Sequence, residues 1–367
     1  MSHKDVFEDA LYLNEIIYGN ILLRSIYDCR EIVYRNRSLH TRNVLDNIIF
    51  KGDTSMKFID LHCDTISILL NQEEQELYSN SLSVDIEKLI KGEAMAQFFA
   101  LFFPLKEVSS AYETTMKLYK KFKEQIDKNT EYIEHVRNYN ELMATGKSGK
   151  IGAFLTIEEG GAIEGSLDKL KEFYDIGVRL ITLTWNYENE IGFPHKIAEP
   201  ATRGLKDFGI EVVREMNRLG MVIDVSHLND NGFYDVIKHS SKPFIASHSN
   251  SREVWGASRN LTDDMIKKLS EAGGVAGLNF CLSFMGQGDI TTLDHMVKHI
   301  ERMVKVGGID VISLGSDFDG IGNKVEINDA SEMGKLAWAL HKKDFSDDDI
   351  EKIFNKNALR VIRDVMK

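Results

Sequence analysis

The chain has 367 residues, of which 43% are hydrophobic and 28% are charged, so it can form one large globular domain or two ordinary ones. Its net charge of −12, without a block of Lys or Arg, argues against nucleic acid as a partner. Three dispersed cysteines, the lack of a secretory signal and the lack of an apolar stretch of membrane-spanning length argue against a disulfide framework and a membrane partner, and they favour a cytoplasmic location.

Residues 1–55 differ in pattern from the rest of the chain. Apolar residues recur at helical spacing between about 5 and 35, and the segment becomes basic after Arg30. We predict a helical N-terminal extension over 1–55 and a separate domain over 56–367. Two interpretations of the extension stay open: an accessory helical arm, or translated sequence upstream of a true start at Met56.

From residue 57 onward, short apolar runs typical of strands alternate with amphipathic stretches typical of helices. Strands are predicted at 57–61, 95–103, 151–157, 179–184, 221–225, 243–247, 274–280 and 311–315. Helices are predicted at 111–127, 166–176, 204–219, 230–239, 262–272, 291–306, 330–341 and 346–366. Eight such units with continuously apolar strands favour an α/β fold, a parallel (β/α)8 TIM-type barrel, over an open sheet.

Acidic and histidine side chains stand where five of these strands end. They are His62, Asp64, Glu158, His227, His248 and Asp317. In a barrel the carboxyl ends of the strands meet at one face, where the active sites of such folds are built. Imidazole and carboxylate groups are suitable zinc ligands, and they favour a metal-dependent hydrolase. Each residue alone is a weak signal, because a strand-end polar pair, a helix cap or a turn explains it equally well.

Two carboxylates have close competitors. Glu158 could bridge two cations, but either it or Glu159 could instead cap the following helix. Asp319 lies on the same strand face as Asp317 and competes with it for a proton-transfer role, although Asp319-Gly320 also suits a turn.

Other chemically active side chains are interpreted as structural. Cys63 is expected to point away from the barrel mouth, because His62 and Asp64 share the opposite strand face. Histidines away from the strand ends, His299 among them, are predicted to be surface residues. His195 is the exception, because it lies on the loop after the fourth strand.

Seven segments together resemble the membrane (renal) dipeptidase family, the zinc dipeptidases of the amidohydrolase-like superfamily. They are DLHCDT, TIEEGG, GVRLITLTWN, VIDVSHLND, PFIASHSNSREV, ASRNLTDDMI and LGSDFDG, and the resemblance runs from about residue 57 to 365. The run from Ile223 to Asp264 is the most specific, because it contains two histidines and an arginine at family spacing.

The resemblance implies two zinc ions per chain. It implies that one ion is bound by His62 and Asp64, that the other is bound by His227 and His248, and that Glu158 bridges them. Glu158 is preferred over Glu159 because its spacing to Ser166-Leu167 matches the family. The resemblance also implies that Asp317 is the catalytic acid near the metals, and that Arg259 pairs with the substrate's terminal carboxylate.

One position departs from the family pattern. Trp185 stands where animal members have a histidine that is thought to polarise the scissile carbonyl. Tryptophan has one N–H donor and cannot become cationic. Either Asn186 or His195 takes over that role beside Trp185 in the substrate site, or the second metal polarises the carbonyl unaided.

The sequence therefore predicts a binuclear-zinc dipeptidase for short peptides with a free C-terminal carboxylate, L-Xaa-L/D-Yaa dipeptides in particular, acting as a homodimer. An alternative is another amidohydrolase-type reaction on a lactone or amide. It is disfavoured because the first strand ends in HxD rather than HxH and no lysine ends the third or fourth strand. A catalytically silent binding barrel, suggested by Trp185, is the second alternative.

Overall fold

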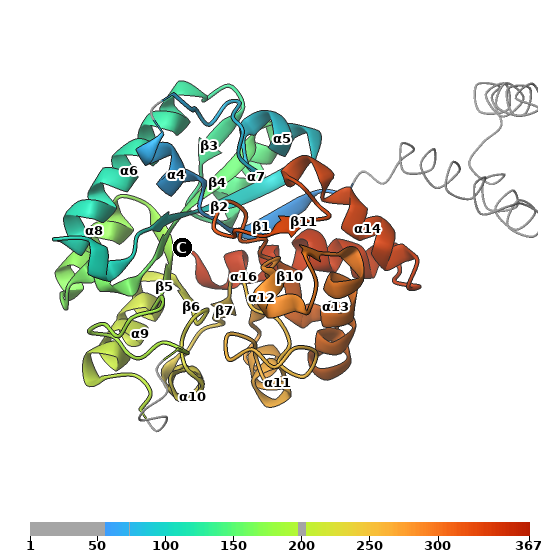
Figure 1. The fold of residues 1–367 in the computed structure, drawn as a ribbon. Coiled ribbons are helices and arrows are strands. Elements are labelled where there is room, and N and C mark those ends of the chain that lie inside the picture. Colours follow the sequence, from blue (N-terminus) through green and yellow to red (C-terminus); the bar gives the residue numbers. More distant parts are fainter. Residues whose placement is uncertain (1–55, 73, 197–202) are drawn as a thin grey trace, which may run out of the picture. The chain divides into compact units, whose positions relative to one another are not determined.

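Eight parallel strands close into a barrel in the computed structural model, which describes residues 56–72, 74–196 and 203–367 (Figure 1). The barrel strands are β1 (Phe58–Cys63), β2 (Ala94–Phe102), β4 (Ile151–Glu158), β5 (Val178–Thr182), β6 (Val222–Asp224), β7 (Ile245–Ala246), β8 (Val275–Leu278) and β10 (Ile312–Leu314). They pair in the order β2-β1-β10-β8-β7-β6-β5-β4, and a β2–β4 ladder completes the ring. The predicted (β/α)8 fold is confirmed, whereas the predicted extension at 1–55 lies outside the described residues.

Helices surround the barrel, and several begin at the capping residues that the sequence indicates. Ser166, Thr262 and Ser346 each accept a hydrogen bond from a backbone N–H in the first turn that follows. The helices are α4 (Thr65–Asn71), α5 (Ile86–Lys91), α6 (Ala111–Lys128), α7 (Tyr139–Lys147), α8 (Leu167–Asp175), α9 (Asp207–Leu219), α10 (Asp230–His239), α11 (Asp263–Glu271), α12 (Leu282–Met285), α13 (Leu293–Gly307), α14 (Gly334–His341), α15 (Asp347–Glu351) and α16 (Asn357–Val365). Among the described residues, none of these helices has the length and apolar character needed to cross a membrane.

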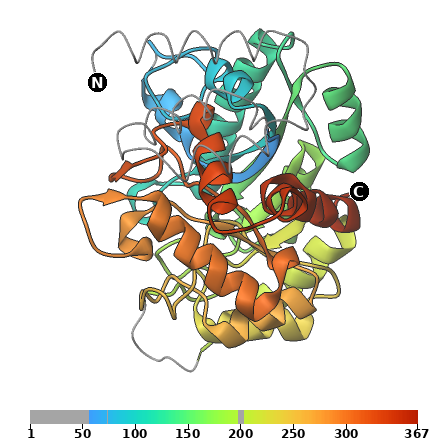
Figure 2. The same cartoon turned by 90° about the vertical axis from the view of Figure 1, so that its right-hand side faces the viewer.

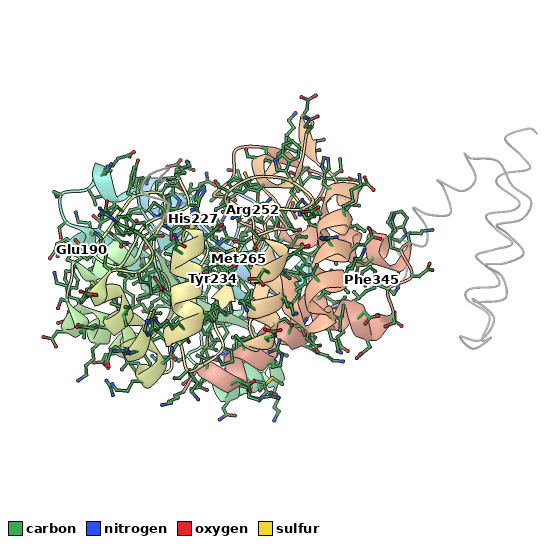
Figure 3. The ribbon with its side chains drawn as sticks, turned by 90° about the horizontal axis from the view of Figure 1, so that it is seen from below. Glu190, His227, Tyr234, Arg252, Met265 and Phe345 are labelled. Atoms are coloured by element: carbon green, nitrogen blue, oxygen red, sulfur yellow. The ribbon has the colours of Figure 1, made fainter. Side chains whose placement is uncertain are left out.

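Helices α10 and α11 show how the outer layer is joined. Tyr234 on α10 donates its hydroxyl hydrogen to Asp264 Oδ2 on α11 at 2.8 Å, and the next residue of α11, Met265, is buried (Tyr234 and Met265 are labelled in Figure 3). The outer layer therefore combines apolar packing against the barrel with polar contacts at its rim.

Some elements are absent from the sequence prediction. The unpredicted helices are α4, α5, α7 and α12, each of nine residues or fewer. The unpredicted strands among the described residues lie outside the barrel and are β3 (Ile133–His135), β9 (Ile290–Thr291) and β11 (Lys324–Val325). The helix predicted over 346–366 is divided by a π-helical segment, Lys352–Lys356. There Asn355 donates to the Lys57 carbonyl at 2.7 Å, which ties the C-terminal region to the start of β1.

The barrel interior is apolar at its amino-terminal end. Its inward residues pack with one face of α16, and together they are Ile59, Leu61, Phe98, Phe154, Leu180, Val222, Ile245, Val275, Ala358, Val361, Ile362 and Val365. Helix α16 therefore closes the end of the barrel at which the strands begin. It is the last helix of the chain, so the C-terminus lies close to it (Figures 1 and 2). The carboxyl ends of the strands remain as the face on which polar groups gather.

Candidate metal centre and active site

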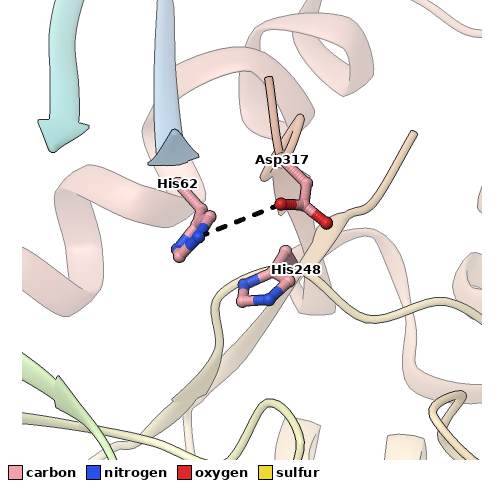
Figure 4. A group of neighbouring side chains, drawn as sticks. All are labelled: His62, His248 and Asp317. Atoms are coloured by element: carbon pink, nitrogen blue, oxygen red, sulfur yellow. Dashed lines mark ion pairs between the residues drawn. The ribbon is translucent and has the colours of Figure 1, made fainter. Parts of the chain in front are cut away.

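The six strand-end residues come together at the carboxyl end of the barrel. Their potential ligand atoms form three overlapping groups, each with all atoms within 4.8 Å: His62, Asp64 and Glu158; Glu158, His227 and His248; and His62, His248 and Asp317. Figure 4 shows the third group, in which His62 Nε2 lies 4.0 Å from Asp317 Oδ1. Residues up to 255 positions apart in the sequence thus share one site, with 317 − 62 = 255 as the widest separation.

Glu158 lies at the centre of this cluster. Its Oε2 is 3.2 Å from His62 Nε2, and its Oε1 is 2.9 Å from His227 Nε2 and 3.4 Å from His248 Nε2. The two carboxylate oxygens therefore face two different sets of ligand atoms. This is the arrangement that a carboxylate needs to bridge two cations.

An irregularity in β1 places His62. Along the β1–β2 ladder Asp60 pairs with Gln97 and Cys63 with Phe99, so β1 has one residue more than β2 over this stretch. Such a bulge changes which side chains face inward. Leu61 packs in the barrel interior, Cys63 packs in the outer core as expected, and the His62 ring stacks on His248 with centroids 3.9 Å apart.

Several residues at the site have backbone conformations that are unfavourable for side chains other than glycine. His227 has φ 67°, Asp317 φ 61° and Glu159 φ 129°. Such conformations cost free energy and tend to cluster at functional sites. Gly320 is required here for a different reason, because a Cβ at this position would lie 2.0 Å from Asp64 Oδ2.

The donor set fits metal ions. Both ring nitrogens of His62 and Asp64 Oδ1 are buried without a hydrogen-bond partner among the described residues. His227 Nε2 and His248 Nε2 lie 3.0 Å apart. Burying polar atoms without partners is costly, and cations placed between these nitrogen and oxygen atoms would satisfy them. A mixed imidazole and carboxylate set is well suited to zinc.

Burial determines the protonation of most of the cluster. Burial lowers the pKa of His227 and His248 well below the ordinary value, so both rings favour the neutral form in which they can bind a metal. Burial also opposes charge on His62, but the nearby Glu158 and Asp64 outweigh it and raise the pKa of His62 well above its usual range.

Asp317 is a largely buried carboxylate at the edge of the cluster. Burial, with the negative charges of Asp64 and Glu158, raises the pKa of Asp317 to about 7, and the attraction of His62 opposes this rise. Its Oδ2 accepts a hydrogen bond from Asn279 Nδ2 at 2.8 Å. Asn279 follows β8 and was missed by the sequence analysis, although a polar residue at the end of the seventh barrel strand is a usable signal.

Asp319 and Glu159 have structural partners elsewhere. Asp319 accepts hydrogen bonds from Thr65 Oγ1 at 2.6 Å and from the Ser83 N–H at 2.7 Å. Glu159 caps the short 3-10 helix Gly160–Ile163 and also accepts from Asn189 Nδ2 at 2.6 Å. The helix-capping role that was open to either glutamate is therefore filled by Glu159, while Glu158 faces the cluster.

The loop after β5 brings Asn186 and His195 beside His227. Asn186 Oδ1 lies 3.3 Å from His227 Nδ1 and 3.2 Å from His195 Nε2. His195 Nδ1 lies 2.9 Å from Ser258 Oγ. Because an amide oxygen only accepts hydrogen bonds, both imidazoles must donate to it, which leaves the Nε2 lone pair of His227 facing Glu158.

Trp185 forms one wall near this loop. Its half-buried ring packs edge-on against Phe102 at 4.9 Å between centroids and lies 6.3 Å from the His227 ring. An open pocket of about 470 Å³ adjoins the same loop, lined by Lys106, Asn186, Tyr187, Glu188, Asn189, Glu190 and Lys206. Trp185 itself is not among the residues that line this pocket.

Arg259 is buried at the mouth of the barrel, with 3% of its surface exposed. Its Nη1 donates to Ser249 Oγ at 2.5 Å, whereas Nε and Nη2 have no hydrogen-bond partner among the described residues. Burial lowers the pKa of this guanidinium, and the charges of Asp317 and Glu158 oppose that effect. Two unpartnered nitrogens, Nε and Nη2, on one planar cation suit a carboxylate ligand.

The prediction that His299 is a surface residue is wrong. Its side chain is fully buried on α13. The Ser251 N–H donates to Nδ1 at 3.1 Å, and Nε2 lies 3.0 Å from the Met285 carbonyl. Burial lowers the pKa of His299 to about 4, so the ring is neutral and joins Ser251, after β7, to the end of α12.

A (β/α)8 barrel with such a cluster at its carboxyl end is typical of metal-dependent hydrolases of the amidohydrolase type. Residues 53–367 match the family model of membrane dipeptidases, peptidase family M19. The chain therefore belongs to that family, and it is a metal-dependent dipeptidase.

One relative is named as a dipeptidase, and two solved structures share the fold. An uncharacterised dipeptidase of Schizosaccharomyces pombe is 31% identical over 333 residues, which cover 83% of this chain and 79% of the relative. A metallopeptidase from Rhodobacter sphaeroides, crystallised with a phosphinate mimic of the dipeptide L-Ala-D-Ala, superposes with a TM-score of 0.79 at 23% identity, over 84% of this chain and 99% of the other. A probable dipeptidase, PvdM from Pseudomonas aeruginosa, also gives a TM-score of 0.79 at 18% identity, over 89% and 99%.

Proposed function

We propose that this chain is a binuclear zinc dipeptidase that hydrolyses short peptides with a free C-terminal carboxylate, with L-Xaa-L/D-Yaa dipeptides as candidate substrates. The observation that carries the proposal is the position of Glu158, whose two oxygens face His62 on one side and His227 and His248 on the other. A single buried carboxylate between two sets of nitrogen ligands supports a two-metal centre.

Five residues hold the metals in this proposal. His62, Asp64 and Glu158 would bind one ion, and Glu158, His227 and His248 the other, as the first two ligand groups are arranged. A bound zinc pair would supply an activated water near neutral pH and a polarised peptide carbonyl.

Asp317 moves the proton. It lies at the edge of the cluster, within 4.0 Å of His62 Nε2, and Asn279 fixes one of its oxygens. From this position its carboxylate can accept a proton from the attacking water and deliver it to the leaving amine.

Arg259 and the β5 loop select the substrate. Arg259 has two nitrogens, Nε and Nη2, that are buried without a hydrogen-bond partner among the described residues, and we assign them to the C-terminal carboxylate of a peptide. Asn186 uses its oxygen to accept from His227 and His195, so its NH₂ group is the part that can donate to a substrate carbonyl. Asn186 is thus the donor that we assign to the role of the family histidine, with Trp185 as a wall and His195 as the support of Asn186.

A stereochemical dipeptide panel tests the proposal. The zinc-loaded protein is assayed with L-Ala-L-Ala, L-Ala-D-Ala and the C-terminal amides of both. L-Ala-D-Ala is a rational first substrate because a phosphinate mimic of it is bound in the Rhodobacter sphaeroides metallopeptidase. We expect hydrolysis of the free dipeptides, little hydrolysis of the amides, and loss of activity with a chelator. Turnover of lactones with no dipeptide hydrolysis would overturn the proposal.

A further inference from the structure

A polar layer lies inside the barrel directly beneath the candidate metal centre. Strands β5, β6 and β7 contribute three residues to the apolar interior, namely Leu180, Val222 and Ile245. Two positions later in the chain, each of these residues is followed by a polar one: Thr182, Asp224 and Ser247. All three are fully buried. Because side chains alternate along a strand, these three share the interior face with the apolar layer.

The carboxylate of Asp224 has all of its acceptor positions filled by hydrogen-bond donors. Oδ1 accepts from the Ser226 N–H at 2.9 Å and the Ser247 N–H at 2.8 Å. Oδ2 accepts from Thr182 Oγ1 and from Ser247 Oγ, both at 2.6 Å. Asp224 therefore acts as an acceptor only, and the hydroxyl hydrogen of Ser247 points to it.

Ser247 passes this constraint to a candidate metal ligand. Its Oγ lies 2.6 Å from His248 Nδ1. Since the Ser247 hydrogen is directed to Asp224, Nδ1 must carry the hydrogen of the imidazole and donate it to Ser247. The lone pair then resides on His248 Nε2, which faces His227 Nε2 at 3.0 Å and Glu158 Oε1 at 3.4 Å.

We propose that Asp224 and Ser247 are positioning residues that fix the tautomer and ring orientation of His248 for metal binding. The inference rests on the metal centre of the proposed function. A hydrogen-bonded partner behind a ligating histidine typically contributes 10–100-fold in metal affinity. Asp224, which is not itself among the candidate ligands, would thus contribute to metal affinity through Ser247.

The chain provides a matched control in Thr182. Its hydroxyl donates to the same oxygen of Asp224 at the same distance as that of Ser247, and both side chains are fully buried. Only the Ser247 hydroxyl contacts His248. Ser247→Ala and Thr182→Val each remove one hydrogen bond to Asp224. They differ because Ser247→Ala also removes the contact with His248 Nδ1 at 2.6 Å and a longer one with Ser226 Oγ at 3.3 Å.

The experiment measures zinc binding to metal-free protein by competition with a chromophoric chelator, with thermal unfolding of the same metal-free samples. We expect Ser247→Ala to weaken one of two zinc sites by about 10–100-fold, and Thr182→Val to change both sites by less than about threefold. The melting temperatures of the two metal-free variants should fall by similar amounts. Equal zinc affinities for Ser247→Ala and the wild type, or equal losses in both variants, would overturn the proposal.

Asp224→Asn provides a second variant. An amide at this position keeps its oxygen toward the two backbone N–H groups and presents NH₂ to Ser247, which turns the serine hydrogen toward His248 Nδ1. This favours the wrong tautomer, so zinc affinity should fall at least as far as in Ser247→Ala, and wild-type affinity would contradict the relay. If the wild type itself binds no zinc, the proposed function fails; if it binds two ions and the variants match it, only the positioning role fails.

Discussion

At the scale of single residues, the site depends on pairs of similar side chains that the fold assigns to different tasks. Glu158 faces the ligand cluster while Glu159 caps a helix, and Asp317 faces His62 while Asp319 accepts from Thr65. In each pair the backbone, not the side-chain chemistry, makes the difference. The aspartate pair therefore offers a matched test of function.

Asp317→Asn should reduce turnover by roughly 10²–10⁴, because an amide cannot accept and return the proton. Asp319→Asn is the matched control, and it should keep near-normal turnover in the folded protein. The measurement is kcat for a dipeptide at saturating zinc, with metal content determined in parallel. Normal turnover in Asp317→Asn would remove this residue from the mechanism.

Arg259→Ala should raise KM for dipeptides by about 10–150-fold, which corresponds to the 1.5–3 kcal/mol of a hydrogen bond to a charged group. The variant should also lose its preference for a dipeptide over the matching C-terminal amide. The measurement is kcat/KM of the wild type and of Arg259→Ala, each with the dipeptide and with its C-terminal amide. An undiminished preference for the free carboxylate in Arg259→Ala would mean that another group binds it.

Sequence reasoning at this scale succeeds where a residue ends an apolar run and fails where burial comes from packing between elements. His62, His227 and His248 are visible as strand-end histidines. His299 lies in the middle of an amphipathic helix, and nothing in the neighbouring sequence shows that Ser251 and Met285 contact its ring. The role of Asn279 was not predicted, because a single asparagine is more often a turn residue than part of a site.

At the scale of elements, strand ends are brought together by close backbone contacts. A Cβ on Gly277 in β8 would lie 1.9 Å from the Ser247 carbonyl oxygen, and one on Gly315 after β10 would lie 1.8 Å from the same atom. Both glycines let the segment that carries His248 pack against its neighbours.

Gly277→Ala should lower the free energy of unfolding by about 1–3 kcal/mol, because the added methyl group meets backbone that cannot move aside cheaply. Gly146→Ala on α7 is the control. A Cβ there meets nothing within 4 Å, so it should stabilise the helix by about 0.5–1 kcal/mol. Urea unfolding of both variants checks the pair, and a neutral Gly277→Ala would show that β8 and the Ser247 segment are loosely packed.

Helix α13 should make stability depend on pH through His299. Its pKa is about 4 in the folded protein and near 6.5 when unfolded, so between these values the unfolded chain binds the extra proton. The stabilisation is complete above pH 6.5 and is lost as the pH falls toward 4, by up to about 3 kcal/mol. Urea unfolding from pH 7.5 to 4.5 should therefore show a steeper decline in the wild type than in His299→Gln. Parallel curves would contradict this role.

The regular pattern of the elements is predictable from sequence, and its interruptions are not. All eight barrel strands lie within a few residues of their predicted ranges because each is a continuous apolar run. The bulge in β1 and the π-helical segment Lys352–Lys356 arise from tertiary contacts, such as Asn355 to the Lys57 carbonyl. The short helices α4 and α5 are too brief for helical periodicity to appear.

At the scale of the whole molecule, the two ends of the barrel are specialised. Helix α16 closes the amino-terminal end with apolar side chains, and the carboxyl end gathers the candidate ligands around Glu158. Stability and chemistry are thus supplied by opposite faces, as in other barrels of this kind. The homodimer and the helical extension over 1–55 remain predictions.

The most direct measurement of the central claim is an anomalous difference map at the zinc edge from crystals of the zinc-loaded protein. We predict two peaks per chain, one between His62, Asp64 and Glu158 and the other between Glu158, His227 and His248. Glu158→Gln should weaken or remove at least one of them. A map with no peak at the carboxyl end of the barrel, or two full peaks in Glu158→Gln, would contradict the account.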